Sequence, residues 1–115
     1  MPFSALGLSP ALTQAATAMG FVAPTPIQEA AIPAILRGAD VVGSAQTGSG
    51  KTAAFALPLL QQLQAGATHT PRRVRALILV PTRELAAQVG EVVRSLAQHL
   101  PQPVKVAVVF GGVSI

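Results

Sequence analysis

The strongest local pattern in the chain is a glycine-rich run that ends in lysine and threonine, Ala45-Gln46-Thr47-Gly48-Ser49-Gly50-Lys51-Thr52. The run follows a β-branched segment, 40–44, and precedes an apolar stretch, 53–63, so the expected order is strand, loop, helix. Glycines let the backbone approach phosphate oxygens, and N–H groups at a helix start favour anions. Lys51 can then reach the β- and γ-phosphates of a nucleotide, and the hydroxyl of Thr52 can ligate Mg²⁺. We therefore predict a phosphate site with Lys51 and Thr52 as its catalytic residues and Thr52 as its metal ligand.

Ala45 departs from the usual form of this loop, in which the first position is glycine. The interpretation therefore depends on Gly50, Lys51 and Thr52, together with their position between a strand and a helix. A glycine-rich turn that happens to contain a lysine is the alternative.

Two further helices have clear boundary signals. Ser9 stands before Pro10, a favoured pair at a helix start, and Gly20 follows the last apolar position of that segment. Thr82 can cap another helix, whose apolar positions recur with helical spacing at Leu85, Val89, Val92, Leu96 and Leu100.

A capping box marks the start of one more helix, in the run Thr25-Pro26-Ile27-Gln28. Because Pro33 lacks the N–H that a continuing helix would use, we expect this helix to end near Ala31. A separate turn over 33–37, closed by Gly38, is expected to follow.

Apolar segments at 41–44, 77–80 and 104–110 read as strands that are buried on both faces. The helix expected over 53–63 is apolar almost all round, and Pro58 is expected to kink it. Strands that alternate with helices at these lengths predict an α/β fold with a parallel sheet and flanking helices.

Composition limits the class of protein. The 115 residues are 50% hydrophobic and 10% charged, which suits one domain or a piece of one and excludes a disordered chain. The sequence contains no cysteine and no apolar run long enough to span a membrane, and its N-terminus has no basic signal region, so we expect a cytoplasmic protein. The net charge of +4 permits nucleic-acid binding, although the cluster Arg72, Arg73 and Arg75 is equally compatible with a solvated loop.

Four motifs, in order along the chain, resemble those of the DEAD-box RNA helicases. The glycine-rich run is one of them. The segment Gly20-Phe21-Val22-Ala23-Pro24-Thr25-Pro26-Ile27-Gln28 resembles the family's adenine-recognition motif, with Phe3 at the place of its isolated upstream aromatic. Pro81-Thr82-Arg83-Glu84-Leu85-Ala86 resembles its first RNA-contacting motif, and Gly111-Gly112 its glycine doublet.

This resemblance implies the N-terminal part of a RecA-like P-loop domain, in which the adenine-recognition segment 1–38 and a partial RecA-like segment 39–115 form one unit. It implies ATP and Mg²⁺ as cofactors, and RNA as a partner held through sequence-independent backbone contacts. The implied nucleotide contacts are Phe3, Phe21, Thr25, Gln28, Ala45, Gln46, Thr47, Gly48, Ser49, Gly50, Lys51 and Thr52. The implied RNA contacts are Pro81, Thr82, Arg83, Gly111 and Gly112.

Each role has a structural alternative. The amide of Gln28 suits the N6 and N7 edge of adenine, but the residue also has its place in the capping box. Phe3 and Phe21 can pack on a base or simply in the core. Thr82 can contact RNA or only cap its helix, and the glycine doublet can be a plain turn.

In the resembling family, ATP hydrolysis also needs an aspartate–glutamate–alanine–aspartate segment, a serine–alanine–threonine motif and a second RecA-like domain. None of these occurs in the 115 residues, so we expect binding of ATP with scarcely any hydrolysis. Strands without sheet neighbours are expected to leave the chain marginally stable or self-associating. A different P-loop enzyme, such as a kinase or a DNA-directed ATPase, and a non-catalytic binding module are the alternatives.

Overall fold

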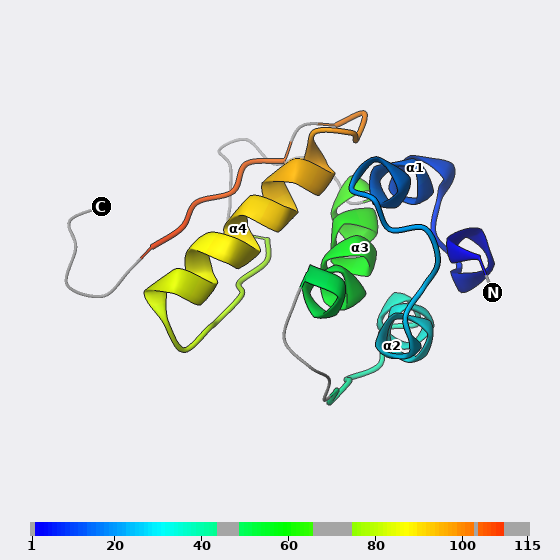
Figure 1. The fold of residues 1–115 in the computed structure, drawn as a ribbon, viewed down its shortest axis with the longest axis horizontal. Coiled ribbons are helices and arrows are strands. Elements are labelled where there is room, and N and C mark those ends of the chain that lie inside the picture. The colour runs from blue at the N-terminus through cyan, green and yellow to red at the C-terminus, as the bar shows by residue number, and fades with distance from the viewer. Residues whose placement is uncertain (1, 44–48, 66–74, 103, 110–115) are drawn as a thin grey trace.

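The computed structural model describes residues 2–43, 49–65, 75–102 and 104–109. These residues form one 3-10 helix and four α-helices in the order shown in Figure 1. The elements are η1 (Phe3–Leu6), α1 (Pro10–Ala18), α2 (Pro26–Leu36), α3 (Ser49–Ala65) and α4 (Arg83–Ala97).

Helix α3 is the centre of the structure and contacts α1, α2 and α4 (Figure 1). Its apolar side chains are fully or almost fully buried at Ala53, Ala56, Leu57 and Leu60. Pro58 is buried as well and lies inside the helix, which continues to Ala65. The core therefore surrounds the helix that follows the glycine-rich run.

The predicted start and end of α1 are confirmed. The hydroxyl of Ser9 accepts from the N–H of Leu12, with Pro10 as the first helical residue. Gly20 follows the helix with a φ of 88°, a left-handed conformation that glycine adopts without strain. The N–H of Phe21 then donates to the carbonyl of Ala16 at 3.0 Å, which closes the helix end.

Helix α2 begins at the predicted capping box, but the expected break near Ala31 is wrong. The helix runs through Pro33 to Leu36, and Gly38, at a φ of 84°, follows its end. Proline removes one hydrogen bond, to the carbonyl of Glu29, which belongs to an exposed residue that water can reach. Burial of the whole side chain of Ile32 in the core outweighs that loss.

Helix α3 begins earlier than predicted. The glycine-rich run was expected to stay a loop through Thr52, whereas the helix starts at Ser49 and places Gly50, Lys51 and Thr52 in its first turn. The first N–H groups of any helix have no acceptor within that helix. The N–H groups of this first turn therefore point out of the N-terminal end of α3.

The predicted strands are wrong for the residues that the structure describes. Residues 41–43, 75–80 and 104–109 have no regular secondary structure, and no backbone hydrogen bond joins one of these stretches to another. A strand is stable only when a neighbour satisfies its N–H and C=O groups, and apolar character alone does not supply that neighbour. Leu77 and Leu79 are consequently exposed rather than buried, at 77% and 84%.

The predicted start of α4 is confirmed, whereas the helix ends at Ala97, before the last predicted apolar position, Leu100, and Val92 is half-buried. Thr82 caps the helix by accepting from the N–H of Leu85 at 3.1 Å, and Val89, Val93 and Leu96 are buried. Residues 104–109 run back along this helix (Figure 1). A side chain at Gly90 would place its Cβ 2.6 Å from Val108, so glycine permits this close approach.

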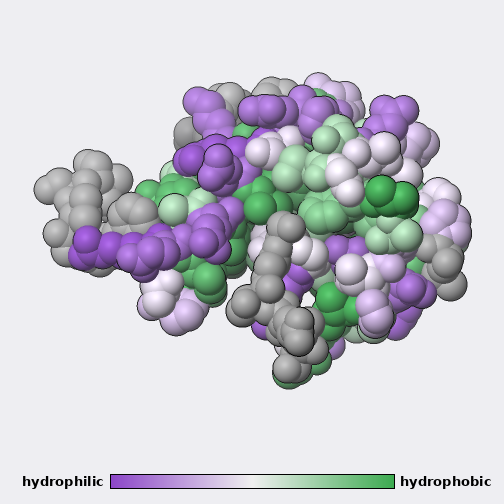
Figure 2. All heavy atoms as spheres, in the orientation of Figure 1, coloured by the Kyte–Doolittle hydropathy of each residue, from purple (hydrophilic) through white to green (hydrophobic). Residues whose placement is uncertain are grey.

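The outer side of α4 carries hydrophilic residues, and apolar residues reach the surface beside it (Figure 2). Within the described residues, no helix combines the length and the hydropathy that crossing a membrane requires.

Candidate nucleotide-binding site

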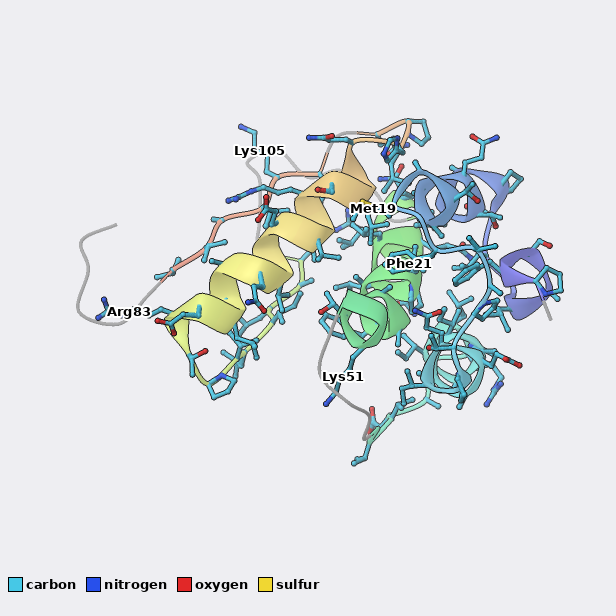
Figure 3. All side chains as sticks on the ribbon, viewed as in Figure 1. Met19, Phe21, Lys51, Arg83 and Lys105 are labelled. Atoms are coloured by element: carbon cyan, nitrogen blue, oxygen red, sulfur yellow. The ribbon has the colours of Figure 1, made fainter. Side chains whose placement is uncertain are left out.

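The start of α3 carries the predicted phosphate-binding residues. Lys51 is exposed and projects from the first turn, away from the helical body, and Thr52 is half-buried (Figure 3). The N-terminus of this 17-residue helix presents N–H groups that have no partner within the helix, and the positive end of the helix dipole. The predicted contacts Ala45, Gln46, Thr47 and Gly48 lie outside the described residues.

Gln28 joins α2 to this first turn. Its side chain is fully buried, and Nε2 donates to the carbonyl oxygen of Gly50 at 2.9 Å. Its Oε1 accepts from the N–H of Thr25 at 3.0 Å, while the hydroxyl of Thr25 accepts from the N–H of Gln28 at 3.4 Å. The capping box is therefore confirmed, and the structure adds a contact between the predicted adenine-recognition and phosphate-binding segments.

No sequence signal pointed to the contact between Gln28 and Gly50, because the two residues are 22 positions apart. A carboxamide has two N–H groups and two oxygen lone pairs, so one donor and one acceptor of Gln28 are not used by these bonds. The number of hydrogen-bonding groups permits the base contact that the resemblance implies, but the side chain is fully buried and would have to become exposed to make it.

The two aromatic residues of the predicted site differ in exposure. Phe3 is only 4% exposed and belongs to the core, which favours its packing role over contact with a base. Phe21 is half-buried beside that core and lies over α3 in Figure 3. The structure thus leaves more surface available on Phe21 than on Phe3.

The predicted RNA contacts Pro81, Thr82 and Arg83 are exposed at the start of α4. Thr82 uses one lone pair of its hydroxyl as the helix cap, and its O–H can still donate to another group. Figure 3 shows Arg83 at the start of α4, well away from Lys51 in that view. Gly111 and Gly112 lie outside the described residues.

Gln61 and Gln62 of α3 were not singled out from the sequence, yet each bonds the backbone of a segment that carries predicted adenine contacts. Gln61 holds Gly7 and Ser9, next to η1, and Gln62 holds Ile35 of α2. Their polar character on a mostly apolar helix is a signal that could have identified them, although it does not identify their partners.

Curated proteins similar to this chain are named as RNA helicases. The chain is 49% identical over 113 residues to the ATP-dependent rRNA helicase RRP3 of Pyricularia oryzae. The matched region covers 98% of the chain and 20% of the relative. It is 45% identical to the DEAD-box ATP-dependent RNA helicase RhpA of Helicobacter pylori, and the matched region covers 98% of this chain and 22% of that relative. The chain thus spans about a fifth of the length of these relatives.

Solved structures similar to this chain are also those of an RNA helicase and a DEAD box protein. A crystal structure of the RNA helicase Prp28 from Chaetomium thermophilum bound to ADP is 43% identical, with a TM-score of 0.81 over 95% of this chain and 26% of that one. A DEAD box protein from Methanococcus jannaschii is 39% identical, with a TM-score of 0.82 over 99% of this chain and 30% of that one. The backbone therefore follows the path of a RecA-like P-loop domain, which confirms the predicted fold class, although the described residues form no strand of its sheet. A family model for the DEAD/DEAH box helicase matches residues 25–115, and the chain belongs to that family.

Proposed function

We propose that this chain binds ATP as the N-terminal part of a DEAD-box RNA helicase, which in its intact form uses ATP binding and hydrolysis to unwind or remodel RNA. The observation that carries the proposal is the 2.9 Å hydrogen bond from Gln28 to Gly50, because it joins the adenine-recognition helix to the phosphate-binding turn. The names of RRP3 and RhpA, and the ADP in the Prp28 structure, support it.

In this proposal the exposed amine of Lys51 neutralises the β- and γ-phosphates, while N–H groups of the loop 45–52 surround them. Packing of α2 on α3 supports the further proposal that residues 1–38 and 39–115 act as one unit.

Mg²⁺ fits the proposed site only together with the nucleotide. The part of the chain that the structure describes holds no group of three histidines or carboxylates suited to a metal, so protein ligands alone would not retain the ion. Mg²⁺ commonly binds through few protein oxygens and the phosphates of its substrate, and the hydroxyl of Thr52 supplies one such oxygen. Its chemistry would be to neutralise phosphate charge.

Lys51→Ala tests the nucleotide proposal. We expect titration calorimetry with Mg²⁺ to detect ATP or ADP binding to the chain and the variant to lose most of that affinity. Lys105→Ala is the matched control, because it removes the same charge from an exposed residue beside α4 (Figure 3). Equal ATP affinity in the chain and in Lys51→Ala would contradict the role of Lys51.

Hydrolysis by this chain is proposed to be very weak, because the segments that hold the metal and the attacking water in the family do not occur in the sequence. This leaves open the alternative of a binding module without catalysis. A phosphate-release assay, with and without RNA, measures the rate; brisk RNA-stimulated hydrolysis would overturn the proposal of a poorly active chain.

RNA binding is proposed at Pro81, Thr82, Arg83, Gly111 and Gly112. Contacts to phosphates predict binding that ignores sequence and weakens steeply with salt. Filter binding to two unrelated RNA single strands over a salt series is the test, and salt-insensitive binding would contradict the proposal.

A cytoplasmic location is also proposed. The lack of cysteine supports it, and cell fractionation is its test.

A further inference from the structure

The C-terminal part of α3 carries glutamines whose side chains each bond the backbone of a different segment. Gln61 bonds the linker between η1 and α1, Gln62 bonds the end of α2, and Gln64 bonds Gln102 after α4. The same helix begins at the phosphate-binding turn. One rigid element therefore connects the phosphate site to these backbone contacts.

Gln61 acts toward the linker as a peptide group would. Its Oε1 accepts from the N–H of Ser9 at 2.6 Å, and its Nε2 donates to the carbonyl oxygen of Gly7 at 3.0 Å. Leu8, between the two bonded residues, is 6% exposed. These two bonds fix the linker that follows η1, and η1 contacts α2, the helix that carries Gln28.

Gln62 acts on α2 at the end opposite to Gln28. Its Nε2 donates to the carbonyl oxygen of Ile35 at 3.0 Å, in the last turn of α2. Gln28, in the first turn, donates to Gly50 of α3. The orientation of α2 on α3 is therefore set by one side-chain hydrogen bond at each end of α2, as well as by the packing between the helices.

Packing is incomplete at the end where Gln61 and Gln62 lie. A hollow of about 420 Å³ opens there, bordered by both glutamines and by Leu6, Pro33, Leu36 and Arg37. Gln61 and Gln62 border this open depression, and their hydrogen bonds add polar contacts to the packing of the linker and of α2 on α3.

We propose that Gln61 and Gln62 are positioning residues for base selectivity, which rests on the proposed binding of ATP. A nucleotide held by its phosphates at the start of α3 can reach with its base only to a limited distance from Lys51. The recognising groups, Gln28 above all, must lie within that distance, and a displacement of about an ångström is enough to lose a productive geometry. Gln61 and Gln62 supply this placement without touching the nucleotide.

The test compares ATP, GTP and inorganic tripolyphosphate as ligands of the 115-residue chain and its variants. Gln61→Met and Gln62→Met keep length and helix propensity but remove the amide. We expect each to lower the preference for ATP over GTP about two- to tenfold, the range for one net hydrogen bond, with tripolyphosphate affinity unchanged. Gln64→Met, on the same helix, is the control and should keep the preference.

Lysine variants separate positioning from general stability. Gln62 only donates, so Gln62→Lys, which also donates, should restore the preference. Gln61 also accepts from Ser9, so Gln61→Lys should not restore it. Equal losses of ATP, GTP and tripolyphosphate affinity, or an unchanged preference in both methionine variants, would overturn the inference. If the unmutated chain bound no ATP, or bound GTP as well as ATP, the proposed function itself would fail.

Discussion

The carboxamide of Gln28 offers two donors and two acceptors, and its bonds to Gly50 and Thr25 use one of each among the described residues. A donor and an acceptor side by side are what the N6 and N7 edge of adenine requires. Guanine presents two acceptors at that edge and would leave the amide oxygen opposite another acceptor. Gln28 is fully buried, so base recognition in addition to capping requires its amide to become exposed to the base.

Gln28→Ala tests this double role. We predict that adenine nucleotides bind more tightly than GTP by about 1 to 3 kcal/mol, the range of a good bidentate base contact, and that the variant loses this preference. Competition titrations of ATP against GTP give the measurement.

The control is Ser9→Ala, which removes the capping hydroxyl of α1 and leaves Thr25 and Gln28 in place. It should lower the free energy of unfolding by about 1 kcal/mol, as loss of a helix cap does, with little change in the preference. If Ser9→Ala erased the preference as fully as Gln28→Ala, loss of stability alone would account for the effect.

Part of the candidate site could be predicted because its signals are local. The capping box at Thr25 and the place of Lys51 at a helix start follow from neighbouring residues, and the structure has both. The link from Gln28 to Gly50 depends on how two helices pack, which spacing along the chain does not specify. The proposed contacts with nucleotide and RNA stay predictions.

At the scale of elements, local sequence signals predict the helix ends correctly, but they fail where tertiary packing determines the secondary structure. Ser9, Gly20 and Thr82 marked boundaries correctly, because caps satisfy the terminal backbone groups of their own helix. Pro33 was misread because burial of Ile32 keeps α2 continuous. The strands were misread because apolar sequence does not provide a pairing partner.

Pro33→Ala follows from that observation. Proline inside a helix costs up to about 3 kcal/mol, whereas alanine restores the N–H that can donate to Glu29. Pro33 is half-buried, so some packing is lost, and we predict a net gain of about 1 to 2 kcal/mol. The midpoint of thermal unfolding should then rise by roughly 4 to 8 °C for each kcal/mol gained.

Pro26→Ala is the matched control in the same helix. Pro26 is the first helical residue, where the missing N–H has no intrahelical partner in any case, so a change near zero is expected. A lower midpoint in Pro33→Ala, with Pro26→Ala unchanged, would show that α2 needs its proline to fit against α3.

At the scale of the whole molecule, apolar surface is concentrated on the unpaired segments. Leu77 is 77% exposed, Leu79 84% and Val109 58%, and the segments 76–80 and 104–109 line an apolar cavity of about 690 Å³ with α3 and α4. The relatives are about five times as long as the chain, and such segments in isolation present unsatisfied backbone groups as well as apolar side chains. Surfaces of this kind favour association.

We therefore predict that the 115-residue chain self-associates through residues 75–80. Sedimentation velocity should show a mean mass that rises with protein concentration. The double variant Leu77→Lys with Leu79→Lys should reduce that rise, because two charges on the associating segment oppose its pairing with a second chain. Val22→Lys is the control: Val22 is 94% exposed but lies in the connection between α1 and α2, so association should persist. A monomer at high concentration with a sharp thermal transition above about 65 °C, beyond the usual range of mesophilic domains, would instead show that these segments need no partner.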